Sequence, residues 1–196
     1  SPMYDSSEET LGKALRALGP TPELFSATKV WHFFTEAGNQ QMIRSRELWG
    51  EPEFDLMQVH NLVNWFDHLQ SIRRDRDAGL VRYVGITTSH GRMHDEVRDL
   101  LRKEPLDFVQ FTYNILDREA EQRLLPLAAD REVAVIINRP FRRGGLIRRF
   151  EDKPLPDWAK EMETPEKAAA SKVQQIRTSV SQDNWKLNYS TVGEHE

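Results

Sequence analysis

DLMQVHNLVNWFDHLQSIRRDRDAGLVRYVGITTS, residues 55–89, is the stretch of sequence that decides the fold. Asp55 to His60 is apolar enough for a buried strand, and Val81 to Thr87 repeats that character further along the chain. Between them, a helix capped by Asn64 and ended by Gly79 places three apolar side chains on one face: Trp65, Leu69 and Ile72. A buried strand, an amphipathic helix and a second buried strand predict a parallel βαβ unit.

The same alternation continues on both sides of this unit. Short apolar segments predict three further strands, at residues 25–31, 108–113 and 133–137. Amphipathic segments predict helices at residues 6–18, 42–49 and 93–101, and after a cap at Asp117. The fold class is therefore α/β. Five units of similar length, with no GxGxxG turn after any strand, favour a (β/α)8 barrel of the TIM type over a doubly wound sheet.

A full barrel of this type takes about 250 residues, whereas the chain has 196. We therefore expect an incomplete barrel with about five parallel strands. Residues 1–158 are interpreted as the partial barrel domain. Residues 159–196 follow a charged, proline-containing segment and have weak helical periodicity, which predicts a divergent tail that is weakly helical or disordered.

Composition narrows the classes of partner. The formal net charge is −4, which gives no footprint for a nucleic acid. No apolar run approaches the roughly 20 residues of a membrane helix, and no signal-peptide pattern opens the chain. The chain contains no cysteine, which excludes disulfides and thiolate sites and agrees with a reducing compartment. We therefore expect a cytoplasmic protein that binds neither membrane nor nucleic acid.

Polar side chains recur where predicted strands end. Tyr4, Lys29 and His60 stand in MYDSSEE, FSATKVW and DLMQVHN, and three more follow at similar spacing: Thr88, Asn114 and Arg139. The loops at the carboxyl ends of parallel barrel strands converge on one face. The phenol, the ammonium and the imidazole are therefore expected to share a pocket.

The segments MYDSSEETLGKAL, SATKVW, DLMQVHN, VRYVGITTS, DFVQFTYNI and INRPFRRGGLI together resemble the aldo-keto reductase family, from Ser1 to about Trp158. That resemblance implies a (β/α)8 barrel that binds NADPH, or sometimes NADH. It also implies that a small aldehyde or ketone is reduced to an alcohol.

The resemblance also implies roles for individual residues. Tyr4 would be the general acid, Lys29 the cation that makes the phenol a better proton donor, and His60 the group that orients the carbonyl. Six positions would contact the nicotinamide cofactor: Thr87, Thr88, Gln110, Asn114, Asn138 and Arg139. Asn138 stands where the family usually stacks a tyrosine on the nicotinamide.

A second hypothesis is a truncated, inactive relative that serves as a binding protein, or a fragment. It is motivated by the start of the chain at Ser1, since the family's catalytic aspartate would precede that residue, and by residues 164–196, which do not match the family's last strand and helix. An open barrel would also expose sheet edges, through which copies could associate. Six apolar residues are expected to face the barrel interior: Val84, Ile86, Val109, Phe111, Val135 and Ile137.

Two further patterns have weaker functional interpretations. His90 and His94 are four residues apart and could share a metal ion, but no HExxH pattern accompanies them, so no metal site is expected. Gly144 and Gly145 could cradle a phosphate with their backbone amides, or could simply make a flexible barrel loop.

Overall fold

A five-stranded parallel sheet forms the centre of the fold. The computed structural model describes residues 1–149, 151 and 153. The strands follow one another across the sheet in chain order, and every neighbouring pair is parallel: β1 (Ala27–Val30), β2 (Phe54–Val59), β3 (Val81–Thr87), β4 (Phe108–Thr112) and β5 (Ala134–Asn138). A doubly wound sheet would reverse its strand order, whereas a barrel keeps it sequential. The predicted α/β class and the five parallel barrel strands are confirmed.

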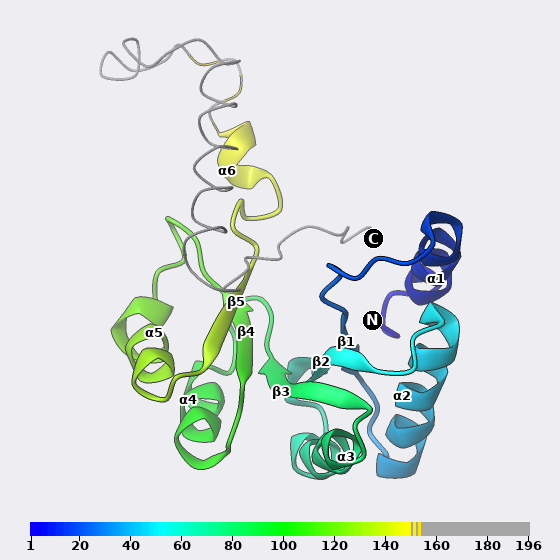
Figure 1. Cartoon of the computed structure of the whole chain (residues 1–196). Helices are drawn as coiled ribbons and strands as arrows, with labels where there is room; N and C mark the ends of the chain where they lie inside the picture. The colour runs from blue at the N-terminus through cyan, green and yellow to red at the C-terminus, as the bar shows by residue number, and fades with distance from the viewer. Residues whose placement is uncertain (150, 152, 154–196) are drawn as a thin grey trace.

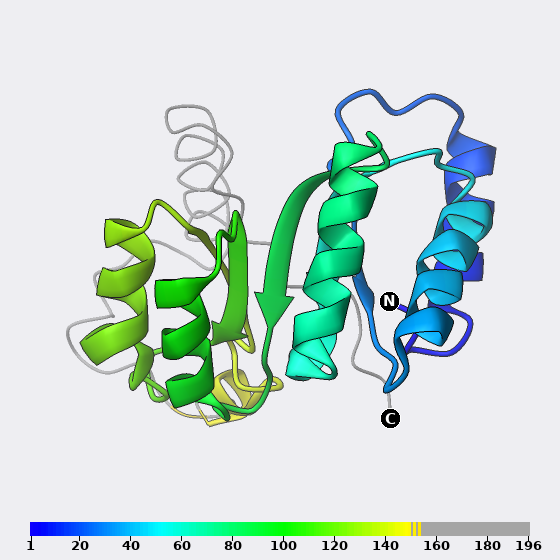
Figure 2. The ribbon, with the colours of Figure 1, turned by 90° about the horizontal axis from the view of Figure 1, so that it is seen from below.

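The longer helices lie on the outer side of the curved sheet, as Figures 1 and 2 show: α1 (Ser7–Leu18), α2 (Thr35–Trp49), α3 (Trp65–Asp77), α4 (His94–Lys103) and α5 (Ala120–Asp130). The short 3-10 helix η1 (His60–Leu62) follows β2 directly, and the short helix α6 (Gly145–Arg148) lies beyond the end of β5. Among the described residues, no helix is long and apolar enough to cross a membrane. The tail expected at residues 159–196 lies outside the described residues.

Two helix boundaries differ from the sequence prediction. Helix α2 begins at Thr35 and not near Met42, because its polar first turns face outward and carry little apolar periodicity. Helix α5 begins after Glu119, so Asp117 is not its cap. The carboxylate of Asp117 instead accepts a hydrogen bond from the side-chain amide of Asn114 at 2.8 Å. A short polar side chain before a helix can hydrogen-bond within a neighbouring turn instead of capping the helix.

The two faces of the sheet have different partners, and the expectation about them was wrong. The residues expected to face the barrel interior pack with the helices instead: Val84, Ile86, Val109, Phe111, Val135 and Ile137 share a cluster with Leu69, Leu101 and Leu124. A separate cluster lies on the opposite, concave face and contains Leu56, Phe108, Ala134 and Ile136, with Phe25 and Tyr83 beside them. Side chains alternate between faces along a strand, but strands that are apolar on both faces do not reveal which set faces the helices.

This alternation places the polar residues of the strands on the concave face. Lys29 pairs with Gln58, and Gln58 lies between two residues of the helix-facing cluster, Met57 and Val59. By the same pairing, Thr87 lies beside Gln110, and Thr112 beside Asn138. The concave face is therefore apolar at the start of the strands and polar toward their carboxyl ends, which is where a barrel carries its active site.

Candidate active site

Three polar side chains that the sequence places far apart come together near the ends of β1 and β2. Lys29 lies within β1, and His60 follows β2 directly. Tyr4 lies in the turn before α1, where its backbone amide donates to the Ser1 carbonyl at 3.0 Å. The rings of Tyr4 and His60 are 5.8 Å apart between centroids, at 49° to each other. Tyr4 is 40% exposed, so its ring is open to solvent on one side.

His60 is buried, with an exposed fraction of 4%. The pKa of His60 is lowered to about 4, chiefly by burial and also by the nearby positive charges of Lys29 and the Ser1 amino group. At neutral pH the imidazole is therefore uncharged. Its Nδ1 lies 3.4 Å from the hydroxyl of Ser1. When Nδ1 accepts from that hydroxyl, Nε2 carries the hydrogen and can act as a donor.

The lowered pKa of His60 predicts a loss of stability in acid. An unfolded histidine titrates near pH 6.5, whereas folded His60 titrates near pH 4, so the unfolded state binds more protons between these values. The contribution of His60 to stability is complete above about pH 6.5 and is lost as the pH falls toward 4. Between about pH 7 and pH 4.5, urea unfolding should show the native chain losing about 2 kcal/mol more than a His60→Gln variant. Equal losses in both proteins would contradict a buried neutral imidazole.

Lys29 is half-buried on the concave face. Burial lowers the pKa of Lys29, and the negative charge of Glu8 opposes that shift. Within residues 1–149, no carboxylate lies within 4.0 Å of the Lys29 ammonium group. Within these residues the ammonium charge of Lys29 is therefore not neutralised by a direct ion pair. The same charge contributes to the lowered pKa of His60.

A second polar group lies at the carboxyl-terminal parts of β3, β4 and β5. The hydroxyl of Thr87 accepts from the Asn61 amide at 3.1 Å, and the Thr88 amide donates to the Gln110 carbonyl at 2.9 Å. Asn138 bridges this group, because its Nδ2 donates to the Thr88 carbonyl at 2.9 Å and its Oδ1 accepts from Thr112 at 2.6 Å. The structure thus brings Thr87, Thr88, Gln110 and Asn138 to one edge of the concave face.

Asn114 lies beside this group but has its side-chain hydrogen bonds occupied. Its Nδ2 donates to the Asp117 carboxylate at 2.8 Å and to the Arg139 carbonyl at 3.1 Å. Its Oδ1 accepts from the amides of Leu116 and Asp117, each at 3.0 Å. An asparagine side chain has two donors and two acceptor sites. Asn114 therefore fastens the β4–α5 loop to the end of β5, and any contact with a ligand requires the release of one of these bonds.

Arg139 begins a cationic cluster at the end of β5. The guanidinium groups of Arg139 and Arg143 both reach Nε2 of His90, which comes from the loop after β3, and Nδ1 of His90 lies 2.8 Å from the Ser89 hydroxyl. The cluster borders a pocket of about 210 Å³ lined by His90, Gly91, His94, Thr112, Asp117, Glu119, Arg139 and Arg142. His94 faces Glu119 at 3.7 Å and does not pair with His90. No group of metal ligands was found among the described residues.

Sequence reasoning missed Glu8, His90 and Arg143 as members of these groups. A signal for Glu8 was present: Glu8, Gly12 and Leu15 are spaced as one helical face, and all three are buried. His90 and Arg143 lie in loops whose backbone has positive φ at both residues, at 65° and 54°. No periodicity in the sequence predicts such loops.

Comparison with known proteins places this geometry in context. The model of the aldo/keto reductase family matches residues 1–193. The curated relatives include aldo-keto reductase YhdN of Bacillus subtilis (strain 168), which is 27% identical over 167 residues, 76% of this chain and 48% of the relative. They also include the NADH-specific methylglyoxal reductase of Escherichia coli (strain K12), which is 26% identical over 72% of this chain and 50% of the relative. The chain thus spans about half the length of these relatives.

Solved structures support the same fold. The holo form of aldo-keto reductase AKR11C1 from Bacillus halodurans has a TM-score of 0.62 and 24% identity, over 76% of this chain and 50% of that chain. An aldo/keto reductase from Klebsiella pneumoniae, solved in complex with NADP and acetate, has a TM-score of 0.61 and 20% identity, over 73% of this chain and 51% of that chain. At these identities the similarity shows the fold alone.

Proposed function

Because the chain belongs to the aldo/keto reductase family, we propose that it contributes the reaction centre of a nicotinamide-dependent oxidoreductase that reduces an aldehyde or ketone to an alcohol. The observation that carries the proposal is the meeting of Tyr4, Lys29 and His60 at the polar end of the concave face. Each supplies one element of carbonyl reduction: a proton donor, a cation and a neutral hydrogen-bond donor.

In the proposed reaction Tyr4 protonates the carbonyl oxygen. A phenol ordinarily has a pKa near 10 and is a poor acid at neutral pH, but a nearby cation stabilises the phenolate that forms. Lys29 is the cation in this role. His60 is neutral because it is buried, and an Nε2–H group can donate to the carbonyl oxygen as negative charge develops there. A charged imidazole in the same place would compete with Tyr4 as the acid.

The polar residues toward the carboxyl ends of β3, β4 and β5 suit a nicotinamide cofactor. When bound, a reduced nicotinamide supplies the hydride. Gln110 is half-buried on the concave face beside Thr87, and within the described part of the chain its side-chain amide makes no hydrogen bond, so it can both donate to and accept from a carboxamide. Asn138, Thr87 and Thr88 would hold the same ring, whereas Asn114 would first have to release a loop hydrogen bond.

Arg139 would bind the phosphate groups of the dinucleotide. Two guanidinium groups that converge on a single imidazole nitrogen concentrate positive charge, and a phosphate would neutralise it. Of the relatives, one is named as NADH-specific and another was solved with NADP. We therefore propose a reduced nicotinamide dinucleotide of either kind, NADPH or NADH, and a small carbonyl substrate in the cytoplasm.

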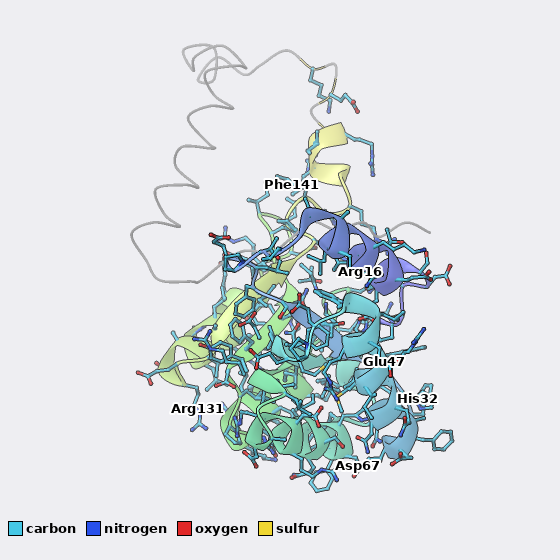
Figure 3. All side chains as sticks on the ribbon, turned by 45° about the vertical axis from the view of Figure 1, so that its right-hand side comes forward. Arg16, His32, Glu47, Asp67, Arg131 and Phe141 are labelled. Carbon is cyan, nitrogen blue, oxygen red and sulfur yellow. The ribbon has the colours of Figure 1, made fainter. Side chains whose placement is uncertain are left out.

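Cofactor binding can be tested before any substrate is known. Titration of the chain with NADPH, followed by its fluorescence, should give a micromolar Kd. Removal of the guanidinium in Arg139→Ala should raise that Kd by about tenfold, because a charge-assisted hydrogen bond contributes about 1.5 kcal/mol or more. Arg131→Ala is the matched control: Arg131 is exposed and precedes β5, and Figure 3 shows it at the opposite end from Phe141.

The same titration addresses the second hypothesis. A chain that folds but shows no saturable binding of NADPH or NADH would favour the inactive binding protein over the reductase. An unchanged Kd in Arg139→Ala would contradict the phosphate role of that residue alone. Strands β1 and β5 are the outer strands of the described sheet, and association of copies through their edges stays a prediction.

A further inference from the structure

Three loops at the carboxyl ends of the strands meet around one small pocket. The loop after β3 carries His90, and the loop after β5 carries Arg139 and Arg143, whose guanidinium groups both donate to Nε2 of His90. In the loop after β5, Nε of Arg142 also lies 3.5 Å from the carboxylate of Asp117, which belongs to the loop after β4. The pocket between these loops has a volume of about 210 Å³. The contact at His90 is therefore one of the links that set its shape.

The backbone of two of these loops has an unusual conformation at this contact. Residues other than glycine rarely have positive φ, yet φ is 65° at His90, 57° at Arg139 and 54° at Arg143. Sparsely populated conformations persist only where surrounding contacts fix them, and they cluster at ligand-binding sites. The contact at Nε2 of His90 joins all three residues. The cluster is therefore a candidate ligand site.

The imidazole of His90 meets two cationic donors with a single lone pair. A guanidinium group only donates, so Nε2 is the acceptor and the ring is neutral. The other ring nitrogen, Nδ1, then carries the hydrogen, and it lies 2.8 Å from the Ser89 hydroxyl. A phosphate or sulfate group offers several oxygen lone pairs and a negative charge, and its hydrogen bonds to a guanidinium are stronger than those of a neutral acceptor. Such an anion and the imidazole compete for the same donors.

We infer that this pocket is an oxyanion site in which the neutral imidazole of His90 takes the place of the anion while the site is empty. A phosphate or sulfate group displaces the imidazole from Arg139 and Arg143. The identity of that anion as a phosphate of a nicotinamide dinucleotide rests on the proposed function. The competition itself can be measured with inorganic sulfate, without cofactor or turnover.

Protonation of His90 should favour the anion. An imidazolium carries a hydrogen on both nitrogens, so it cannot accept from a guanidinium, and it adds a positive charge to the cluster. An ordinary histidine gains this proton near pH 6.5. Four other charged or titratable groups line the pocket: His94 faces Glu119 at 3.7 Å, and Arg142 faces Asp117. All four are kept in every variant of His90, so a comparison of those variants isolates the effect of His90.

The experiment titrates the full chain with sulfate at constant ionic strength and follows the backbone amide resonances of Gly91 and Gly144, which lie beside the cluster. Sulfate remains a dianion between about pH 5.5 and pH 8, so only the protein titrates. At the higher pH, His90→Gly should bind sulfate about fivefold more tightly than the native chain, because no acceptor competes for the guanidinium groups. Glycine also suits a φ of 65°.

His90→Gln is the matched control. Its amide oxygen can accept from a guanidinium in place of Nε2 but does not titrate, so its Kd for sulfate should stay within about twofold of the native value at the higher pH. At the lower pH the native chain should bind sulfate about fivefold more tightly than at the higher pH, and His90→Gln should lack this change. Arg143→Ala should bind sulfate more weakly than the native chain at both values.

Three results would overturn the inference. Weaker binding of sulfate by His90→Gly than by the native chain would make the imidazole a ligand of the anion and not its competitor. Equal affinity of these two proteins at the higher pH would remove the competition, and an unchanged Kd in Arg143→Ala would place the anion elsewhere. Failure of the proposed function would instead appear as absent NADPH binding with the sulfate affinities in the expected order.

Discussion

A Tyr4→Phe variant is expected to reduce carbonyl substrates about a hundredfold more slowly than the native protein, or slower still. Loss of a general acid typically costs 10²- to 10⁴-fold in rate. The change removes one hydroxyl and keeps the ring that lies 5.8 Å from the imidazole. NADPH affinity should therefore stay close to the native value, so that the loss falls on kcat.

The measurement is the oxidation of NADPH with a panel of small aldehydes. Tyr113→Phe is the matched control, because the hydroxyl of Tyr113 donates to Glu121 of α5 at 2.5 Å, away from the concave face. That variant should keep its rate. Equal rates for Tyr4→Phe and the native protein would show that Tyr4 is not the acid. Native protein that binds NADPH but reduces no carbonyl compound would contradict the reaction class.

Gly12→Ala should destabilise the chain by about 3 kcal/mol, the largest expected effect of a single methyl group in this fold. Helix α1 crosses α2 at Gly12, and a Cβ atom there would lie 1.8 Å from the Leu48 carbonyl oxygen and 3.1 Å from Cα of Trp49. Alanine favours a helix over glycine by about 1 kcal/mol, which opposes the loss but is smaller than the cost of separating two packed helices. Backbone atoms cannot move aside as a side chain could.

The control for this substitution is Gly145→Ala, because a Cβ atom at Gly145 meets nothing within 4 Å. Urea unfolding should place Gly145→Ala within about 0.5 kcal/mol of the native chain and Gly12→Ala well below it. Figure 3 shows the outer surfaces of the two helices, with Arg16 on α1 and Glu47 on α2. Equal stability of the two alanine variants would contradict the close crossing at Gly12.

The division of the sheet into two faces explains how one small fold can hold both an apolar core and a cluster of polar side chains. The helix-facing side is apolar along most of the strands, and its polar exception in β1 is Thr28, whose hydroxyl donates to Glu8. The concave side changes from Leu56 and Phe108 to Gln58 and Gln110 within two residues of the same strands. Burial, together with the positive charges of Lys29 and the Ser1 amino group, lowers the pKa of His60 to about 4, so the imidazole is neutral near pH 7.

Local patterns in the sequence determined the order of the elements and the residues at the strand ends. The spacing of apolar residues predicted the five strands and α1, α3 and α4 nearly as they occur. A helix buried on one face and a strand buried on both faces each require a characteristic spacing of apolar residues. The strand-end positions of Lys29 and His60 followed from those strands. Their approach to Tyr4 followed from the general rule that barrel loops converge.

Only the tertiary structure decided which side chains share a face and which charges meet. Val84 and Phe111 were expected inside the barrel but lie under the helices. The sequence of a strand that is apolar on both faces does not reveal which face is turned toward the helices. Glu8 looked like one more acid in the first turn of a helix, as favourable in solvent as Glu9 beside it. Its burial against Thr28 and Ser45 depends on how closely α1 approaches α2 at Gly12, and such a distance is a property of the packed fold, since residues far apart in sequence set it together.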